Sequence, residues 1–377
     1  MKIAIVHESL VVYGGSEQFV SDLLSIYPEA DLFALIDFLD EDKRKLMLNK
    51  HAKTTFLQKF PKAKSKYKSY LPFMPLAIEQ LDLSDYDLVI SSSHCVAKGI
   101  ITNPNQIHIS YVHSPIRYAW DLQNQYLRES GLDKGFKGWI AKIILHYMRI
   151  WDSRTSSGVD YFIANSKFIA KRIWKCYHRK ADVVYSGIDT TDFKYCDKKE
   201  DFYLTASRMV PYKKIDIIVE AFSKMPDKKL IVIGTGPDFK KIQAKAKENV
   251  VLMGYQGFDV LLEHMQKAKA FVFAAEEDFG RVPVEAQSCG TPVIAYGRGG
   301  ALETVRGLGL QDKPTGVFFK KQTAEDVIEA VNKFEKHIDE IDYKNCRENA
   351  LNFSLDNFRK NFKEYVDNVI KENNLDK

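Results

Sequence analysis

Short apolar segments alternate along the chain with segments in which apolar residues recur at every third or fourth position. The first pattern predicts buried β-strands and the second predicts amphipathic helices, and their alternation is typical of βαβ units with parallel strands. The predicted strands are residues 2–7, 86–92, 107–112, 160–166, 202–207, 229–236, 250–254, 268–275, 291–296 and 315–319. Residues 215–225 and 259–269 are two of the helices expected between them. The pattern therefore indicates an α/β protein with doubly wound sheets.

The length of 377 residues exceeds one ordinary core and suits two domains of roughly 100–200 residues each. A polar link at residues 183–201 favours a first domain at residues 1–185 and a second at residues 186–354. In the last segment, residues 355–377, apolar residues at three- and four-residue steps predict one helix with a single buried face: Leu355, Phe358, Phe362, Val366 and Ile370. We expect this helix to return and pack on the first domain, because its apolar face needs a partner.

Composition and charge weigh against several other classes of protein. Apolar residues make up 45% and charged residues 28%, as in soluble globular proteins, and a net charge of +5 without a zinc-finger or RNA-recognition pattern predicts no nucleic-acid partner. Five scattered cysteines without a C-x-x-C pair predict neither a disulfide framework nor a zinc site. The first residues form a predicted strand instead of a signal peptide, and no apolar segment approaches the ~20 residues of a membrane span. We therefore expect a cytoplasmic protein.

Common nucleotide and metal motifs are missing or misplaced. There is no P-loop pattern, and the run GTGPDF at Gly234 lacks the third glycine of a dinucleotide fingerprint. Asp85-Tyr86-Asp87 looks like a D-x-D metal clamp but enters a strand, whereas ligands of parallel sheets lie beyond the carboxyl ends of strands. We expect no bound metal.

Two cations follow the first predicted strand of the second half. Arg208 comes at the end of strand 202–207, and Lys213 lies five residues later at a helix start. Cations at a strand end and a helix N-terminus suit a diphosphate, because the helix end adds amide donors and a positive dipole. The alternative for such residues is a solvated loop.

Acidic residues flank the start of a later helix in EEDFGRVPVEAQSCG. Glu277 ends strand 268–275, Gly280 gives backbone amides close access to a ligand, and Pro283 is placed to open a helix with Glu285 in its first turn. A carboxylate there caps a helix favourably, but one carboxylate also commonly accepts two hydrogen bonds from ribose hydroxyls. The run thus combines a possible sugar site with a possible ribose site.

Together these motifs resemble the retaining nucleotide-sugar glycosyltransferases of family 4, which have the GT-B fold. The resemblance rests on E-x7-E at Glu277 and Glu285, on R-x4-K at Arg208 and Lys213, on the glycine loop YGGSEQ, and on GRGGALETV with Gly299, Gly300 and Glu303. It spans nearly the whole chain. It implies two Rossmann-like domains that face a cleft, with acceptor binding in the first and nucleotide-sugar binding in the second.

The resemblance also assigns roles to individual residues. Arg208 and Lys213 would neutralise the diphosphate, Glu285 would hold the ribose, and Glu277 with the amides at Phe279 and Gly280 would hold the donor sugar. Gly14 and Gly15 would bring backbone amides against the phosphate or the acceptor with a geometry that glycine permits most easily, or they form a plain tight turn. His113 would lie beside the transferred sugar.

The segment HSPIRYAWDLQNQYL is similar to a subgroup of mannosyltransferases that use GDP-mannose in polysaccharide or lipopolysaccharide assembly. Arg117, Trp120 and Asp121 would then line the acceptor side, or they pack in the domain. A UDP-sugar donor stays open, because no residue that reads the base is evident. The implied mechanism is retention by front-face attack, in which the leaving diphosphate acts as base and no metal or cofactor is required.

Residues 50–78 form a basic segment with seven lysines and no acid, interleaved with apolar residues that include Phe60, Tyr67, Tyr70, Leu71, Phe73 and Met74. Such runs are usually solvated surface. The mixture in Lys50–Met74 also suits docking on an anionic membrane, at about 1 kcal/mol per lysine near the surface. A lipid-linked saccharide acceptor would give the protein a reason to be peripheral on the inner face of the cytoplasmic membrane.

Three rival functions use the same scaffold. A nucleotide-sugar epimerase would need no acceptor, and a phosphorylase would need a pyridoxal lysine, for which the sequence offers no context. A non-catalytic sugar-nucleotide-binding subunit would be expected to have lost Arg208, Lys213, Glu277 or Glu285, all of which are present.

Overall fold

The computed structural model describes residues 1–374, which fall into two compact units. The N-terminal unit consists of Met1–Tyr185 together with the chain from Phe358 onward, and the C-terminal unit consists of Ser186–Asn357. Each unit has its own parallel sheet and its own buried apolar cluster.

The N-terminal unit is built on a seven-stranded parallel sheet in the order β3-β2-β1-β4-β5-β6-β7. Its strands are β1 (Ile3–His7), β2 (Asp31–Ala34), β3 (Lys53–Thr54), β4 (Leu88–Ser93), β5 (Ile107–Val112), β6 (Tyr161–Ala164) and β7 (Asp182–Val183). Its helices are α1 (Gly15–Ile26), α2 (Glu41–Arg44), α3 (Ala63–Lys66), α4 (Met74–Glu79), α5 (Gln123–Glu129), α6 (Gly135–Thr155) and α7 (Lys167–Tyr177), with short 3-10 turns η3 (Tyr67–Phe73) and η4 (Ala97–Gly99). The four strands predicted for this half are confirmed as β1, β4, β5 and β6.

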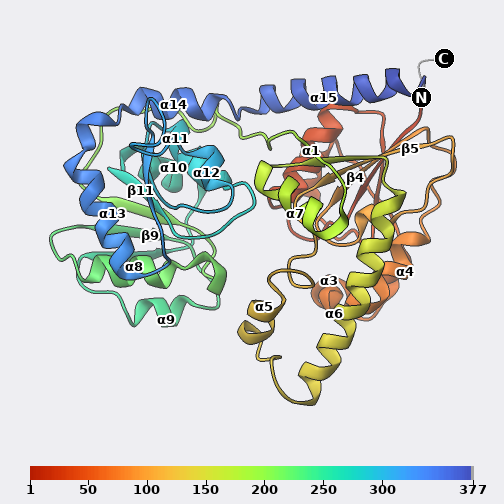
Figure 1. The fold of residues 1–377 in the computed structure, drawn as a ribbon, viewed down its shortest axis with the longest axis horizontal. Coiled ribbons are helices and arrows are strands. Elements are labelled where there is room, and N and C mark those ends of the chain that lie inside the picture. Colours follow the sequence, from red (N-terminus) through yellow and green to blue (C-terminus); the bar gives the residue numbers. More distant parts are fainter. Residues whose placement is uncertain (375–377) are drawn as a thin grey trace. The chain divides into compact units, whose positions relative to one another are not determined.

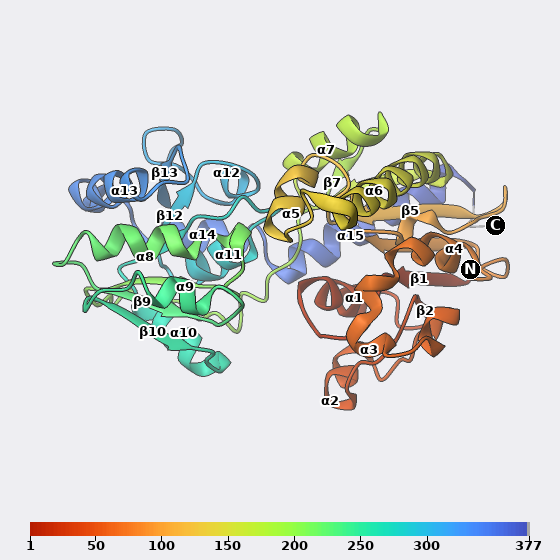
Figure 2. The same ribbon diagram turned by 90° about the horizontal axis from the view of Figure 1, so that it is seen from below.

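The C-terminal unit has a six-stranded parallel sheet in the order β10-β9-β8-β11-β12-β13, and Figure 2 labels β10 and β9 toward one edge and β12 and β13 toward the other. Its strands are β8 (Tyr203–Ala206), β9 (Leu230–Ile233), β10 (Val250–Gly254), β11 (Ala270–Phe273), β12 (Val293–Tyr296) and β13 (Gly316–Phe319), and all six were predicted. Its helices are α8 (Ile215–Ser223), α9 (Phe239–Gln243), α10 (Phe258–Lys267), α11 (Arg281–Ser288), α12 (Ala301–Thr304), α13 (Ala324–Lys336) and α14 (Tyr343–Leu351), with the 3-10 turn η6 (Pro211–Lys213).

In both sheets the strand order reverses once. The reversal lies between β1 and β4 in the N-terminal unit and between β8 and β11 in the C-terminal unit. In open parallel sheets, ligands bind beyond the carboxyl ends of the strands at this switch point, where adjacent loops diverge. The topology therefore marks one candidate site in each unit.

The last helix, α15 (Leu355–Glu372), lies along the N-terminal unit (Figure 1). The Phe358 and Phe362 rings pack on Phe19 of α1 and on Tyr111 of β5, with ring centroids 5.4–6.3 Å apart. The expected return of the C-terminal helix to the first domain is confirmed, and the buried apolar face predicted from its spacing is the face that makes these contacts.

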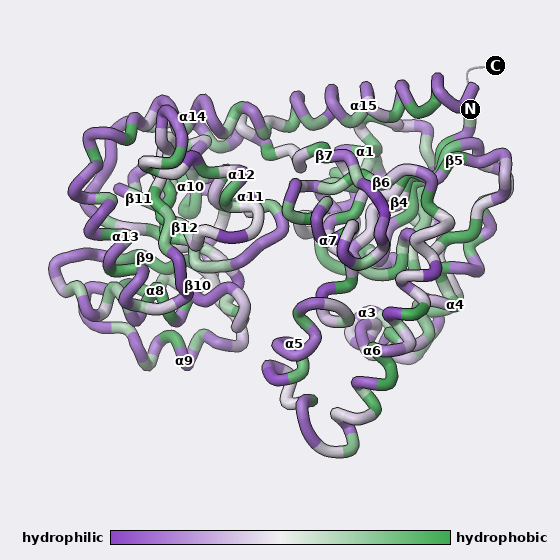
Figure 3. The backbone as a smooth tube through the Cα atoms, in the orientation of Figure 1, coloured by the Kyte–Doolittle hydropathy of each residue, from purple (hydrophilic) through white to green (hydrophobic). Residues whose placement is uncertain are grey.

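Hydrophobic residues concentrate on the strands of each sheet and on the inward helix faces (Figure 3). Across the described residues 1–374, every helix is too short or too polar to span a bilayer.

Candidate functional site

In the C-terminal unit, four loops that contain residues of the motifs discussed above leave neighbouring strands on the same sheet edge. Arg208 follows β8, Gly234 follows β9, Glu277 follows β11 and Gly299 follows β12. These strands are consecutive in the sheet order, and the switch point lies between β8 and β11. Residues that are far apart in sequence are thereby gathered where a parallel sheet offers a binding site.

The loop that carries Arg208 is packed tightly against the glycine run after β9. Met209 donates its amide to the Thr235 carbonyl at 2.9 Å, and a Cβ atom on Gly234 would lie 2.0 Å from the Ser207 carbonyl oxygen. Gly234 also has φ of +133°, which side chains rarely adopt. The GTG run is therefore a support for the Arg208 loop, a role that the sequence analysis did not assign to it.

Lys213 and Glu277 form an ion pair across the switch point. Lys213 ends the turn η6 before α8, and Glu277 follows β11, so the pair joins the loops of the two strands between which the order reverses. Both side chains are largely shielded, with exposed fractions of 14% and 16%. The predicted cation and the predicted carboxylate thus meet at one place, while Arg208 stays exposed at the same edge.

The second glycine motif holds the loop of Glu277 in place. Gly300 donates its amide to the Glu277 carbonyl at 2.8 Å, and a Cβ atom on Gly300 would lie 2.4 Å from the Phe279 backbone. Gly280 follows with φ of +83° and precedes the first residue of α11. The pair Gly299-Gly300 is needed because the two loops touch backbone to backbone.

The predicted position of Glu285 in its helix is wrong by two residues. Helix α11 begins at Arg281, two residues before Pro283, so Glu285 lies in the second turn. A carboxylate there does not cap the helix, because capping needs a position at or just before the first turn. Withdrawal from water raises the pKa of the Glu285 carboxyl, and the positive charges of Arg281 and Lys213 oppose this rise.

Arg281 was missed by the sequence analysis although it stands inside the quoted motif. Its guanidinium donates to the Gly187 carbonyl at 3.0 Å and contributes positive charge at Glu285. Its position directly after Gly280 could have identified it as a candidate site residue. A cation at the start of a helix is not stabilised by the helix dipole, so its presence there suggests a role other than helix stability.

In the N-terminal unit, His113 belongs to a chain of polar side chains at the switch point. Its Nε2 lies 2.9 Å from the Ser92 hydroxyl of β4, and the same hydroxyl lies 3.1 Å from Nδ1 of His7 in β1. Nε2 of His7 lies 3.6 Å from a carboxylate oxygen of Glu17 in α1. His113 is therefore linked through two buried side chains to an acid, a connection that its sequence position alone did not reveal.

Glu17 also fixes the glycine loop before α1. Its carboxylate accepts the Gly14 amide at 3.0 Å and the Ser16 hydroxyl at 3.0 Å. Burial acts to raise the pKa of Glu17, but His7, the backbone amide of Glu17 and the Ser16 hydroxyl outweigh it and lower the pKa. The expected geometric need for glycine is not met at Gly14: its φ is −132°, which any residue adopts, and its amide is bonded to Glu17. Gly15 is the first residue of α1.

A second buried acid, Glu8, closes the loop after β4. Its carboxylate accepts backbone amides of four successive residues, His94, Cys95, Val96 and Ala97, at 2.6–3.1 Å. Burial acts to raise the pKa of Glu8, yet its interaction with His94 and the amides of Ala97, Val96 and Cys95 lower it. Glu8 thus fixes the backbone of this loop beside His94, and the sequence offers no motif for it.

Two cavities adjoin in this unit. A cavity of about 380 Å³ has Arg117, Lys68, His94 and Glu8 in its lining, and we call it the polar cavity after these side chains, although tyrosines and aliphatic residues supply most of its surface. A groove of about 310 Å³ is lined mainly by apolar side chains, including Leu127, Leu132, Ile144 and Leu145. Four residues line both: Lys68, Leu71, Tyr118 and Tyr126. The pair of cavities can hold a molecule that is polar at one end and apolar at the other.

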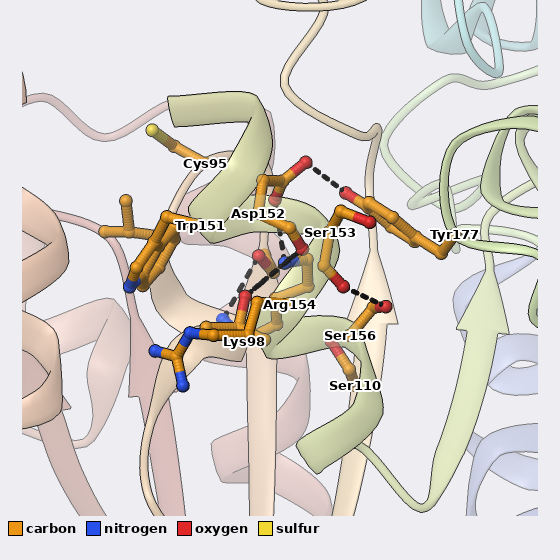
Figure 4. Close-up of polar contacts among 12 residues, drawn as sticks. Cys95, Lys98, Ser110, Trp151, Asp152, Ser153, Arg154, Ser156 and Tyr177 are labelled. Carbon is orange, nitrogen blue, oxygen red and sulfur yellow. Dashed lines mark hydrogen bonds and ion pairs between the residues drawn. The ribbon is translucent and has the colours of Figure 1, made fainter. Parts of the chain in front are cut away.

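Of the three residues expected on the acceptor side, Arg117 lines the polar cavity, and the other two have structural bonds. The Trp120 indole donates to the Asp152 carboxylate at 2.7 Å, and Asp121 pairs with Arg172 at 2.7 Å. Asp152 is fully buried and also binds Lys98 and Tyr177 (Figure 4). The packing alternative therefore accounts for Trp120.

The basic segment does not present its aromatic residues to solvent as the membrane interpretation assumed. Phe60, Tyr67, Tyr70 and Leu71 pack against the core of the unit, and Met74 is buried. Phe56, Phe73 and Leu76 are exposed, and most of the lysines face solvent. The segment therefore supplies positive charge and three exposed apolar side chains, while most of its aromatic residues pack inward.

Within residues 1–374, no cluster of three or more histidine, cysteine, aspartate or glutamate side chains has a geometry that could hold a metal ion. Asp85 and Asp87 of the D-x-D run precede β4 at the opposite sheet edge, and Asp87 accepts the Lys2 amide at 2.6 Å.

Family models match both halves of the chain. Residues 14–192 match the model of Glycosyltransferase Family 4, and residues 189–353 match that of Glycosyl transferases group 1. A D-inositol 3-phosphate glycosyltransferase of Mycobacterium sp. (strain KMS) is 28% identical over 173 residues, which cover 39% of this chain and 39% of that protein. A GDP-mannose-dependent monoacylated alpha-(1-6)-phosphatidylinositol monomannoside mannosyltransferase of Corynebacterium glutamicum is 32% identical over 114 residues, 26% of this chain and 30% of that protein. The chain thus matches 39% or less of the length of these relatives.

Solved structures resemble nearly the whole chain. The Anabaena protein HepE in complex with UDP aligns with a TM-score of 0.71 at 16% identity and covers 98% of this chain and 100% of that chain. The same protein has also been solved with UDP-glucose, with a TM-score of 0.69 at 17% identity. At this identity the likeness shows the fold alone.

Proposed function

The chain is a GT4-like glycosyltransferase with the GT-B fold, and from this premise we propose that it transfers a hexose from a nucleotide-sugar donor to a glycan or lipid-linked saccharide. The observation that carries the proposal is the ion pair of Lys213 with Glu277 at the switch point of the C-terminal sheet. A cation held there by a carboxylate, with Arg208 at the same edge, suits a ligand that combines a diphosphate with a sugar.

The proposed reaction retains the anomeric configuration through front-face attack. The acceptor hydroxyl attacks from the side on which the nucleotide leaves, and the departing diphosphate takes its proton. Arg208 and Lys213 stabilise the negative charge that grows on the diphosphate, so no metal is required for this purpose. Glu277 and the amides at Phe279 and Gly280 hold the sugar, and Glu285 accepts hydrogen bonds from the ribose.

The N-terminal unit would receive the acceptor. The polar cavity with Arg117 and His94 suits a saccharide or phosphate, and the adjoining apolar groove suits a hydrocarbon chain. This combination favours a lipid-linked saccharide over a free glycan. His113 would lie beside the transferred sugar, as in the family pattern.

GDP-mannose is the first donor to test, because HSPIRYAWDLQNQYL is similar to mannosyltransferases and the Corynebacterium relative is named GDP-mannose-dependent. A UDP-sugar is the alternative, because HepE, which has the same fold, has been solved with UDP and UDP-glucose. Peripheral attachment to the inner face of the cytoplasmic membrane, in polysaccharide or lipopolysaccharide assembly, would accord with a lipid-linked acceptor.

Calorimetric titration with GDP-mannose, GDP, UDP-glucose, UDP-N-acetylglucosamine and UDP tests the donor. Binding of GDP and GDP-mannose alone supports the mannosyltransferase, whereas binding of the uridine ligands alone replaces it with a UDP-sugar transferase. If none binds, the transfer reaction is excluded. If a donor binds but is not turned over with lipid-linked saccharide acceptors, the alternative of a non-catalytic sugar-nucleotide-binding subunit is favoured.

The ribose role of Glu285 predicts a pH-dependent affinity. Only the ionised carboxylate accepts both hydroxyl hydrogen bonds, and its pKa is raised in the free protein by withdrawal from water. Nucleotide affinity of the wild type should therefore fall at a higher pH than an ordinary glutamate with pKa of about 4.3 would cause. Glu285→Gln should bind the nucleotide roughly 10- to 100-fold more weakly at high pH, and its affinity should lack the pH dependence that comes from Glu285.

The measurement is a calorimetric Kd series for both proteins with the same nucleotide between about pH 8 and pH 5. The nucleotide phosphates titrate equally in both series, so the ratio of the two Kd values isolates Glu285. A ratio that does not change with pH would contradict the assignment.

The link from His113 to His7 predicts a positioning role for Ser92. Ser92→Ala removes the hydroxyl that both histidines share, and the loss of about 1 kcal/mol corresponds to a kcat roughly five- to ten-fold lower. The donor KM should be unchanged, and the pH profile of kcat should shift because His113 loses its fixed partner. Lower stability of the N-terminal unit with an unshifted pH profile would instead indicate a structural role only.

A further inference from the structure

Helix α6 presents a second apolar face to solvent, away from the face that packs in the apolar core of the N-terminal unit. Large apolar side chains recur along it at three- and four-residue steps with exposed fractions from 39% to 74%: Phe136, Trp139, Ile140, Ile143, Tyr147 and Ile150. The other face is buried through Leu145, Met148 and Trp151. Scattered exposed apolar residues are ordinary, but a continuous stripe on one helix marks an interaction surface.

Helix α6 is fixed at its C-terminal end, and its N-terminal half extends away from the sheet, so its outer face is accessible to a partner. Figure 1 shows α5 and the first half of α6 reaching away from the sheet of the N-terminal unit, and Figure 3 shows hydrophobic positions along α6. The Glu79 carboxylate of α4 fixes the last turns of α6, because it accepts hydrogen bonds from the partly buried Trp151 indole at 2.8 Å and from the exposed Arg154 guanidinium at 2.6 Å. The stripe is therefore held on a rigid support.

The charges around the stripe identify the partner. From Lys134 to Thr155 the chain has five basic residues and a single acid, Asp152, whose buried carboxylate is 2.7 Å from the Lys98 ammonium. Lys134, Lys137 and Lys142 are exposed. A second copy of this helix would bring like charges together, whereas an anionic lipid surface complements them.

The residue types agree with a lipid surface. Aromatic rings, here Phe136, Trp139 and Tyr147, are favoured at the boundary between lipid headgroups and acyl chains. A helix with one apolar stripe and basic flanks lies in the plane of that boundary without crossing it. We propose that the outer face of α6 docks the protein on an anionic membrane, with the apolar stripe inserted and the flanking lysines on the headgroups.

This surface would also place the groove beside the lipid. Ala141, Ile144 and Leu145 of α6 line the groove, which continues into the polar cavity through Lys68, Leu71, Tyr118 and Tyr126. A chain that leaves the bilayer along α6 would enter the groove with its polar head in the cavity. Docking itself requires neither a donor nor an acceptor, so it can be tested even if the proposed transfer reaction fails.

The experiment measures binding of the full chain to phosphatidylcholine vesicles with and without phosphatidylglycerol by co-sedimentation. We expect the wild type to bind the anionic vesicles, less so at high salt, and Trp139→Glu/Ile143→Glu to bind at least about ten-fold more weakly. The matched control is Tyr255→Glu/Leu310→Glu, which places the same charges at exposed apolar positions of the C-terminal unit and should bind as the wild type.

Two further measurements locate the contact. In a Trp174→Phe background, which removes the other exposed tryptophan, Trp139 fluorescence should shift to the blue and be quenched by brominated lipid. Unchanged binding of Trp139→Glu/Ile143→Glu, with loss of binding only on charge reversal of Lys62, Lys64, Lys66 and Lys68, would overturn the proposal in favour of the basic segment. A wild type that ignores vesicles but forms dimers that the same variant dissociates would overturn it in favour of a second copy.

Discussion

Replacing Lys213 with alanine is expected to lower kcat by about 10²- to 10³-fold, with a much smaller change in donor affinity. The ammonium is 14% exposed and paired with Glu277, so it faces the ligand site from a fixed position with little water around it. Its attraction to the diphosphate grows as the glycosidic bond breaks and negative charge builds on the leaving group. An interaction that is strongest in the transition state lowers kcat when it is removed.

The decrease in kcat should be larger than the loss of one positive charge alone would cause, because the Glu277 carboxylate is left unpaired beside an anionic ligand. Glu277→Gln in the Lys213→Ala background should therefore recover part of the rate, although each single change lowers it. Steady-state kinetics of the four proteins in this cycle measure the coupling, with Lys240→Ala on α9 as a control for loss of a lysine elsewhere in the same unit. If Lys213→Ala raised KM and left kcat unchanged, the leaving-group role would be wrong.

The sequence predicted the long strands and the tandem architecture because buried parallel strands are continuous apolar runs. It missed β2, β3 and β7, which have two to four residues and little pattern of their own. Pro283 predicts a start of α11 that is two residues late, because the helix begins at Arg281 and the proline lies inside its first turn. Proline is tolerated throughout the first turn, so its position limits a helix start without fixing it.

Candidate site residues could be predicted where the motif itself supplies the charged groups, as with Arg208, Lys213, Glu277 and Glu285. The residues that hold these side chains and loops in place could not be predicted, because they come from other strands and helices. Gly234 supports the Arg208 loop across a strand boundary, and Glu17 reaches His113 only through His7 and Ser92. The apolar stripe on α6 could not be predicted from the sequence for a related reason. A helix with apolar residues on two faces has weak amphipathic periodicity, and only the fold shows which of the two faces is buried.

Replacing Asp152 with alanine is expected to destabilise the N-terminal unit by about 3–5 kcal/mol. The Lys98 ammonium is 1% exposed and lies 2.7 Å from the Asp152 carboxylate, 2.8 Å from the Asp152 carbonyl and 2.9 Å from the Thr155 hydroxyl. Figure 4 shows Lys98 of η4 against Asp152 near the end of α6, together with the Tyr177 hydroxyl that reaches Asp152 from α7. Without the carboxylate, a buried ammonium keeps only neutral partners, and Tyr177 and Trp120 lose their acceptor.

Urea unfolding followed by tryptophan fluorescence measures this effect, because all four tryptophans lie in the N-terminal unit. Lys98→Met should cost less than Asp152→Ala, since the carboxylate it leaves behind retains the Tyr177 hydroxyl and the Trp120 indole as donors. Lys53→Met, which breaks the exposed pair with Asp31, is the control and should change stability by less than about 1 kcal/mol. Equal costs for the buried and the exposed pair would show that burial of the ions is not what makes the pair matter.

The double variant Lys98→Met/Asp152→Leu separates the cost of an orphaned charge from the value of the pair. Removing both ions also removes their desolvation penalty, so most of the stability lost in either single variant should return. The double variant still lacks the Asp152 carboxylate, which accepts the hydrogen bonds of Trp120 and Tyr177 at α6. A stable double variant that still binds anionic vesicles would limit the pair to folding, whereas a stable one with weakened vesicle binding would show that these bonds set the direction in which α6 presents its apolar stripe.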